Sequence, residues 1–240
     1  MATKEKMTQE DIMNLLEKLY DKAIQGIPKV SPPISQLAEN YITKSPILES
    51  AAKSFINYQI AKCTTSGFLT GLGGIVTLPV AIPANVGSVL YVQMRMIACL
   101  AYMGGYDTNS DQVQTLVYAC LAGISVDQIV KQTGIKVGMK MANAMIKKIP
   151  GSALTKINQK VGFRLLTKFG TTGVINLGKM IPFVGGIIGG GFDFAETKII
   201  ADRAYKMFIL NDFTSSDKDK QDIIDMDEFE VVEEQVNTNI

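Results

Sequence analysis

The stretch ANVGSVLYVQMRMIACLAYMGGYD, residues 84–107, is apolar over most of its length and ends in two adjacent glycines before Tyr106. It predicts a helix from about Ala84 through Met103. Gly104 and Gly105 would end this helix, because glycine readily adopts the left-handed conformation of a helix C-cap. An apolar helix of this length belongs either in a packed core or in lipid, and both readings stay open at this point.

The sequence before this helix is unusual because no charge occurs between Lys62 and Arg95, over 32 residues. A transmembrane helix needs about 20 apolar residues, so the length alone would permit one. The glycines and prolines of residues 67–83 argue against a single uninterrupted span and predict a close-packed turn. A second uncharged segment, residues 180–192, is also rich in glycine.

Within these two segments, glycines recur four residues apart, a spacing that lets helix backbones approach closely in lipid or in a dry core. We predict close helix packing at Gly67, Gly71, Gly185, Gly186, Gly189 and Gly190. A phosphate-binding loop is not indicated, because no GxGxxG follows a strand pattern and no GK[ST] occurs.

The remaining periodicity predicts further helices and no pair of strands. Thr8 and Asp11 suggest a capped helix start, and Gly26 and Pro28 end that pattern, after which a turn-rich link is expected. Later helices are expected from Pro46 to about Ser66, from Ser110, from Ser125 to Lys148, from Ser152 to Phe169, and from Asp193 to Ile209. The sequence therefore predicts one all-α multi-helix domain over residues 8–211.

Charge is distributed unevenly along the chain. Residues 212–240 contain ten acids and two bases, which leaves 22 bases and 13 acids in residues 1–211. This segment is expected to be a disordered acidic tail. Residues 128–192 contain ten Lys or Arg and no acid.

Several chemistries are excluded or disfavoured by composition. The chain has no histidine, which rules out a Ser-His-Asp triad, a Cys-His dyad or an HExxH zinc site. Cys63, Cys99 and Cys120 lack metal-ligand spacing and are expected to be buried thiols in a reducing compartment. No metal or cofactor is predicted. Residues 1–21 are amphipathic and contain no apolar run that could serve as a signal-peptide core, so a cytoplasmic location is expected.

The basic segment contains a regular pattern. Four basic residues recur every four positions and form one ridge on a helix, and three more fall close together on the helix expected before it. The first set is Lys156, Lys160, Arg164 and Lys168, and the second is Lys136, Lys140 and Lys147. The ridge is interpreted as a solvated face, as a contact for anionic lipid, or as a contact for a protein partner or the acidic tail. Nucleic acid is disfavoured because the ridge has few arginines and few neighbouring aromatic residues.

A polar site is a second possibility. Asp193 and Glu196 share a helix face and could bind a cation, although acids near a helix N-terminus usually serve the helix dipole. The candidate residues for a buried polar site are Asn85, Asp193, Thr197 and Arg203.

Two groups of short motifs, taken in their order along the sequence, resemble the EcsC family. The first contains Gly71-Leu72-Gly73-Gly74, Leu78-Pro79, Ile82-Pro83-Ala84-Asn85 and Gly104-Gly105-Tyr106-Asp107, and the second leads from Ile181-Pro182-Phe183-Val184-Gly185-Gly186 through Asp193 and Thr197 to Ala204. The chain differs from the family pattern at Asn85, where an acid is common, and at Asp193, where an amide is common. The resemblance covers roughly residues 50–210 and implies an all-helical domain, often linked to membranes or to ABC-transporter contexts.

Taken together, these features predict a membrane-associated helical protein without a self-contained catalytic site. It would contact anionic lipid through the basic ridge and the glycine-rich segments, as an adaptor or a membrane remodeller. Two alternatives are a membrane-inserting toxin or pore former, and a hydrolase or ligand-binding protein with a site near Asp193. The sequence does not predict an oligomeric state.

Overall fold

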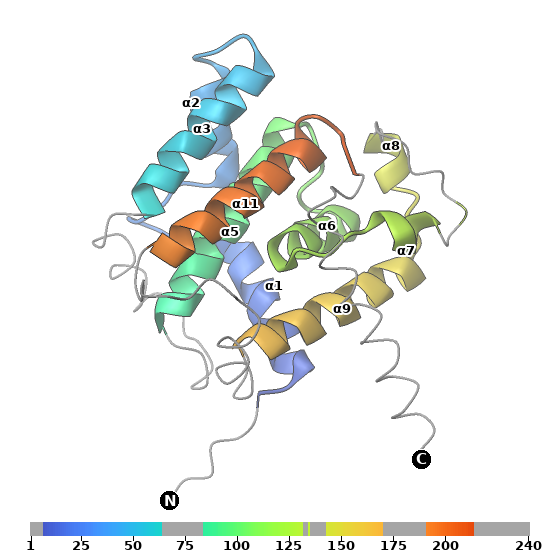
Figure 1. Cartoon of the computed structure of the whole chain (residues 1–240). Helices are drawn as coiled ribbons and strands as arrows, with labels where there is room; N and C mark the ends of the chain where they lie inside the picture. The colour runs from blue at the N-terminus through green and yellow to red at the C-terminus, as the bar shows by residue number, and fades with distance from the viewer. Residues whose placement is uncertain (1–6, 64–83, 132–133, 135–142, 170–190, 214–240) are drawn as a thin grey trace, which may run out of the picture.

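The structure is a computed structural model that describes residues 7–63, 84–131, 134, 143–169 and 191–213. The secondary structure of these residues is helical, apart from one isolated bridge between Ile27 and Ser31. The all-α prediction is therefore confirmed (Figure 1). The helices are α1 (Gln9–Gln25), α2 (Ile34–Ile42), α3 (Leu48–Cys63), α5 (Ala84–Met103), α6 (Asp111–Ala122), α7 (Asp127–Lys131), α8 (Asn143–Ile146), α9 (Gly151–Phe169) and α11 (Gly191–Phe208).

Helix α5 forms the centre of the fold. It has the predicted bounds, Ala84–Met103, and it packs against α1, α2, α3, α6 and α11. Every residue from Leu90 to Ala101 is buried. The apolar length of α5 thus serves a protein core that surrounds the helix on all sides. Residues 64–83, which were expected to form the close-packed turn, lie outside the described residues.

Helices α5 and α11 run parallel to each other in a fixed register. The Gln93 side-chain amide donates a hydrogen bond of 3.1 Å to the Thr197 hydroxyl, and the backbone of Gly104 lies against the carbonyl of Phe208. Each pair is separated by 104 residues in the sequence. Because both contacts join residues 104 positions apart in the sequence, the two helices run in the same direction and keep one register along their length.

This register places large residues opposite small ones. Ile97 and Leu100 of α5 are level with Ala201 and Ala204 of α11, and all four are buried. Alanine at these positions lets the two helix axes approach while the larger side chains fill the space between them. On α11 this buried face includes Thr197, Ala201 and Ala204.

Residues 104–106, which directly follow α5, pack against the C-terminal end of α11. A Cβ on Gly104 would lie 2.1 Å from the Phe208 carbonyl oxygen, so this position has room for glycine alone. Gly105 has a φ of 78°, as the predicted C-cap requires. The Tyr106 ring packs edge-on against Phe208 at 5.3 Å, and its hydroxyl donates a hydrogen bond to Asn211.

Several other predicted helix ends are confirmed. Thr8 caps α1 in a capping box with Asp11, and α1 ends before Gly26, which has a φ of 77°. Ser110 caps α6 by accepting a hydrogen bond of 3.4 Å from the Val113 N–H. Helix α9 begins one residue before the predicted start, at Gly151, and α11 begins two residues before its predicted start.

Two predictions about helices were wrong. Residues 34–42 form α2, although this region was expected to belong to a turn-rich link, because Pro33 ends the link and serves as the N-cap residue of a helix. The single helix expected from Ser125 to Lys148 is not continuous. Helix α7 ends at Lys131, and Gly134 follows in a turn with a φ of 80°. The Ser125 hydroxyl bonds to Asp127.

Candidate functional site

The basic ridge lies on α9, beside the face that α9 buries. The buried face repeats every four residues through Ala153, Ile157, Val161 and Leu165, and it packs against α6 and α1. In the sequence each ridge residue stands one position before or three positions after a buried one, which places the ridge about 60–100° around the helix from the buried face. The fold of α9 therefore does not require the ridge cations to enter the core.

The ridge residues differ in exposure. Lys156 is exposed, whereas Lys160, Arg164 and Lys168 are half-buried along the flank of the helix. Lys147, which follows α8, is exposed as well. Of the second predicted basic set, Lys136 and Lys140 lie outside the described residues, so a continuous surface through all seven positions stays a prediction.

The predicted packing glycines fall in the segments that the structure does not describe. Gly67, Gly71, Gly185, Gly186, Gly189 and Gly190 all lie there. The close backbone approach that those glycines were expected to provide occurs among the described residues at Gly104, in a motif that had been interpreted only as a helix end.

Three residues of the predicted polar site, Asn85, Asp193 and Thr197, belong to the parallel pair of α5 and α11, and the site itself stays a prediction. Thr197 is buried and bonds to Gln93, which sequence analysis did not identify. Asn85 and Asp193 belong to the first turns of α5 and α11, and their side chains are outside the described part of the structure. The register places these two positions four residues apart along the shared axis, or about 6 Å.

Arg203 belongs to a different place from the other three residues. Its guanidinium donates to the carbonyl of Cys120 at 3.3 Å and covers Gly123, the left-handed C-cap of α6. A cation at this position complements the partial negative charge of the helix C-terminus. The interaction explains Arg203 as a cap for α6, so the structure does not bring it to the proposed polar site.

Arg95 of α5 serves α1 in the same way. This arginine is buried, donates at 2.8 Å to the carbonyl of Ala23 in the last turn of α1, and also donates to the carbonyl of Pro32. Burial lowers the pKa of the guanidinium from its usual value, although arginine stays charged at physiological pH. Gln93 and Arg95 are the long polar side chains within the buried stretch Leu90 to Ala101, and their contrast with the apolar neighbours was the available signal for both.

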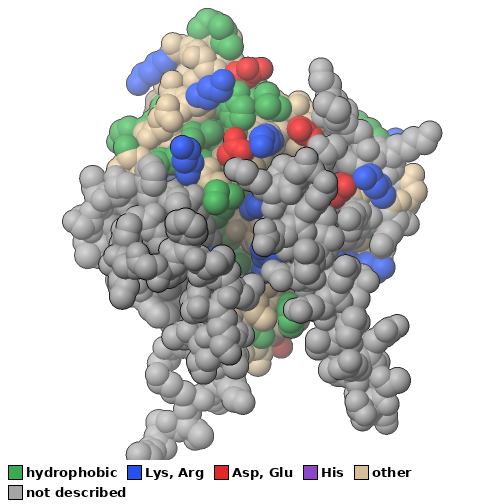
Figure 2. Space-filling view, viewed as in Figure 1, with side chains coloured by type: hydrophobic (Ala, Val, Ile, Leu, Met, Phe, Trp, Pro, Cys, Tyr) green, Lys and Arg blue, Asp and Glu red, His purple; other side chains and the backbone are tan. Residues whose placement is uncertain are grey.

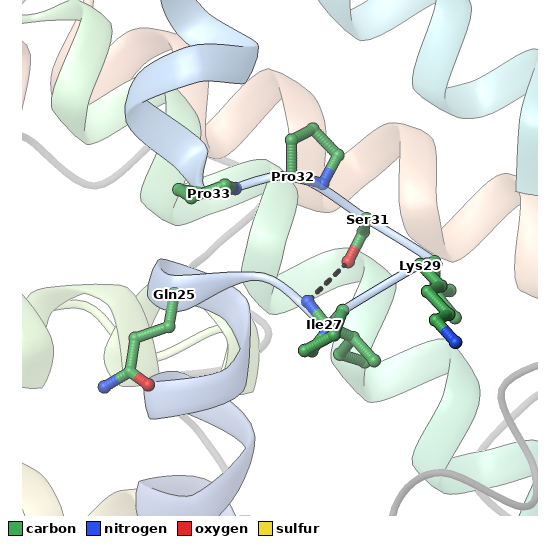
Figure 3. Close-up of a pocket in the computed structure, with 8 residues that line it drawn as sticks. Gln25, Ile27, Lys29, Ser31, Pro32 and Pro33 are labelled. Atoms are coloured by element: carbon green, nitrogen blue, oxygen red, sulfur yellow. Dashed lines mark hydrogen bonds between the residues drawn. The ribbon is translucent and has the colours of Figure 1, made fainter.

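A shallow pocket borders the link between α1 and α2 (Figure 3). The Ser31 hydroxyl accepts a hydrogen bond of 3.1 Å from the Ile27 N–H and shares one of 2.8 Å with Tyr91. In Figure 3 the side chains of Gln25 and Lys29 point away from each other. The lining includes one hydroxyl and one ammonium but no acid, which gives no set of groups for acid–base catalysis.

The cysteines that the structure describes in full are structural. Cys99 and Cys120 are buried, and burial raises the pKa of the Cys99 thiol to about 12. A thiol with this pKa is almost entirely protonated at neutral pH and is a poor nucleophile. Cys63 ends α3, and its side chain is not described.

Among the described residues, no group of three or more His, Cys, Asp or Glu side chains is arranged to hold a metal ion. The same part of the chain contains no helix that is both long enough and apolar enough to cross a bilayer.

The fold and the site define an all-helical protein with a fully buried central helix and a basic ridge on a peripheral one. The sequence matches the model of the EcsC protein family over residues 3–210, and the chain belongs to this family. The match begins well before residue 50, where the resemblance had been placed, and thus includes α1. Searches of curated proteins and of solved structures found no match.

Proposed function

We propose that this EcsC family protein associates peripherally with anionic membrane surfaces, at the cytoplasmic leaflet, through the basic ridge of α9. The observation that carries the proposal is the position of the ridge. Four basic residues at Lys156, Lys160, Arg164 and Lys168 lie beside the buried face of α9, within a run of residues 128–192 that contains no acid.

Each basic residue of the ridge adds its own contribution to the free energy of membrane binding. Like charges four residues apart destabilise a helix by roughly 0.2–0.5 kcal/mol per pair. A negative surface facing the ridge would therefore attract the basic side chains and also relieve the repulsion among them. Each Lys or Arg near an anionic membrane contributes about 1 kcal/mol. A ridge of four gives reversible binding that weakens with salt, because exposed charges are screened beyond about 8 Å at physiological ionic strength.

The test is co-sedimentation of the full-length chain with vesicles of phosphatidylcholine containing phosphatidylserine. Reversing two ridge charges, Lys160→Glu with Arg164→Glu, should lower affinity by about 30-fold or more, since about 2 kcal/mol is lost and repulsion is added. The matched control reverses Lys18 and Lys198, which are exposed on α1 and α11. The control should lose much less affinity, and circular dichroism should show that both variants are folded.

Two results would contradict the proposal. One is equal binding of the ridge variant and the parent at low salt. The other is binding to vesicles of phosphatidylcholine alone that does not change with salt. Release of an entrapped dye on binding would instead favour the pore-former alternative, because a peripheral protein leaves the bilayer closed.

A further inference from the structure

The turn between α2 and α3, residues 42–47, exposes two isoleucines at one extremity of the molecule. Ile47 is 63% exposed and Ile42 is 37% exposed, although large apolar side chains elsewhere in the described helices are mostly buried. Figure 1 shows the turn projecting at the top of the body, and Figure 2 shows hydrophobic side chains at that end. We call residues 42–47 the hairpin tip.

Four polar groups of the hairpin tip donate hydrogen bonds to carbonyls of the tip or of the last turn of α2. The Thr43 hydroxyl donates at 2.7 Å and the Thr43 N–H at 3.0 Å to the carbonyl of Glu39. The Lys44 N–H bonds to the Tyr41 carbonyl at 3.2 Å, and the Ser45 hydroxyl bonds to the Ile47 carbonyl at 3.2 Å. Because these hydroxyls and amides already have partners, they lose little when water is replaced by an apolar medium.

The base of the tip is held rigidly. Tyr41 packs edge-on against Phe55, with ring centroids 5.4 Å apart, and Phe55 is buried against the core. Thr43 continues the α2 hydrogen-bonding pattern, and α3 begins at Leu48. Because the backbone is fixed on both sides, the two isoleucines do not collapse onto the body, and little ordering entropy is lost when they meet a partner.

Size, shape and charge point to a bilayer as that partner. Two isoleucines on a convex tip supply a small part of the roughly 800 Å² that each side of a stable protein interface or dimer contributes. Lys44 is the one charged residue between Glu39 and Glu49, and it stands between the isoleucines. This order suits an interfacial anchor, in which apolar side chains enter the acyl boundary while a lysine reaches the headgroups.

We propose that the hairpin tip inserts Ile42 and Ile47 into the interface of a lipid bilayer, as a second membrane contact. Figure 1 places the tip and α9 at opposite ends of the body, so the tip meets the bilayer in a different orientation from the ridge. This inference needs a bilayer but does not need the ridge, and the two proposals can fail separately.

The chain contains no tryptophan, which makes a single-tryptophan experiment direct. The full-length Ile47→Trp variant carries its only tryptophan at the tip. Mixed with phosphatidylserine–phosphatidylcholine vesicles, it should show a blue-shifted emission and quenching by brominated lipid. The matched control is Ile199→Trp on α11, because Ile199 is 60% exposed on a different helix. Its emission should stay that of a solvated indole.

The outcomes separate the two proposals. If the Ile47→Trp protein sediments with vesicles but its emission is unchanged, the tip does not insert, and the ridge proposal stands. If the shift persists when Lys160 and Arg164 are reversed to glutamate, the tip acts independently of the ridge.

A second variant tests the same inference without a probe. Replacing both isoleucines, Ile42→Asn with Ile47→Asn, should lower vesicle binding in the reversed-ridge background about tenfold, while thermal unfolding stays unchanged because both positions are exposed. Equal binding of this variant and its parent would overturn the proposal.

Discussion

Helices α5 and α9 both carry positive charge, but the two helices hold it at different depths in the molecule. In α5 the single arginine is buried and donates to the carbonyls of Ala23 and Pro32. In α9 four basic residues follow a line beside the buried face, and apolar residues alone supply that face. The cation of α5 therefore lies inside the molecule and serves helix ends, whereas the cations of α9 lie beside a buried face rather than within it.

The largest expected effect follows from the tight contact between α5 and α11. Gly104→Val should destabilise the protein by about 3 kcal/mol or more, since overpacking a tight contact typically costs about 1–3 kcal/mol and a backbone oxygen cannot turn aside. Urea unfolding followed by circular dichroism measures the change. The control is Gly151→Ala at the start of α9, where an added Cβ meets nothing within 4 Å. A parent-like Gly104→Val protein would show that the helices are not closely paired.

Replacing Arg95 should destabilise the protein more than replacing Arg203, because Arg95 is the more buried of the two capping arginines. Arg95→Met removes the hydrogen bonds to the buried carbonyl of Ala23 and to the carbonyl of Pro32, and hydrogen bonds of charged groups contribute about 1.5–3 kcal/mol each, so a loss of about 2–4 kcal/mol is expected. Arg203→Met should cost only about 1 kcal/mol, because Arg203 is half-buried and its hydrogen bond to the Cys120 carbonyl at the end of α6 is long, at 3.3 Å. Chemical denaturation of both variants tests the order, and a larger effect at Arg203 would reverse our interpretation of which cap is structural.

A smaller effect should show whether the Gln93–Thr197 bond fixes the register. Thr197→Val or Gln93→Met alone leaves a buried polar partner unsatisfied and should cost about 1–3 kcal/mol. The double variant should be less destabilised than the sum of the single variants, because neither group is then orphaned. Strict additivity in this double-mutant cycle would mean that the two side chains do not interact in solution.

The smallest effect is expected on α9. Lys156→Gln should change the free energy of unfolding by less than about 0.5 kcal/mol, since Lys156 is exposed and lies outside the buried face. The same denaturation experiment checks this. A loss comparable to that of Arg95→Met would remove the distinction between the two helices.

The sequence predicted those helices whose ends are set by residues close to them in the chain. The bounds of α5 could be predicted because its apolar run meets a glycine pair, and those of α1 because Thr8 and Gly26 mark its ends. Helix α2 was missed because proline reads as a breaker, whereas Pro33 here precedes a helix. The break after α7 was missed because Gly134 was taken as part of a helix rather than as a turn residue of positive φ.

The candidate site was less predictable, because its partners are distant in sequence. Thr197 was identified but Gln93 was not, since their contact depends on the register of two helices that are 104 residues apart. Arg203 was assigned to the polar site because it shares α11 with Thr197, yet it turns to the end of α6. Periodicity indicates which face of a helix is buried, but it does not indicate which helix covers it.

The parallel pairing of α5 with α11 also bears on how the chain is made. Synthesis proceeds from the N-terminus, and α1, α2, α3 and α6 can pack on α5 once about half of the chain has emerged. The face of α5 that Ala201 and Ala204 cover stays open until α11 leaves the ribosome. Contacts of such long sequence separation form late and slow the folding reaction. A nascent chain of this protein therefore exposes one face of its central helix from the emergence of α5 until α11 has emerged, and this is the period in which it most needs protection from aggregation.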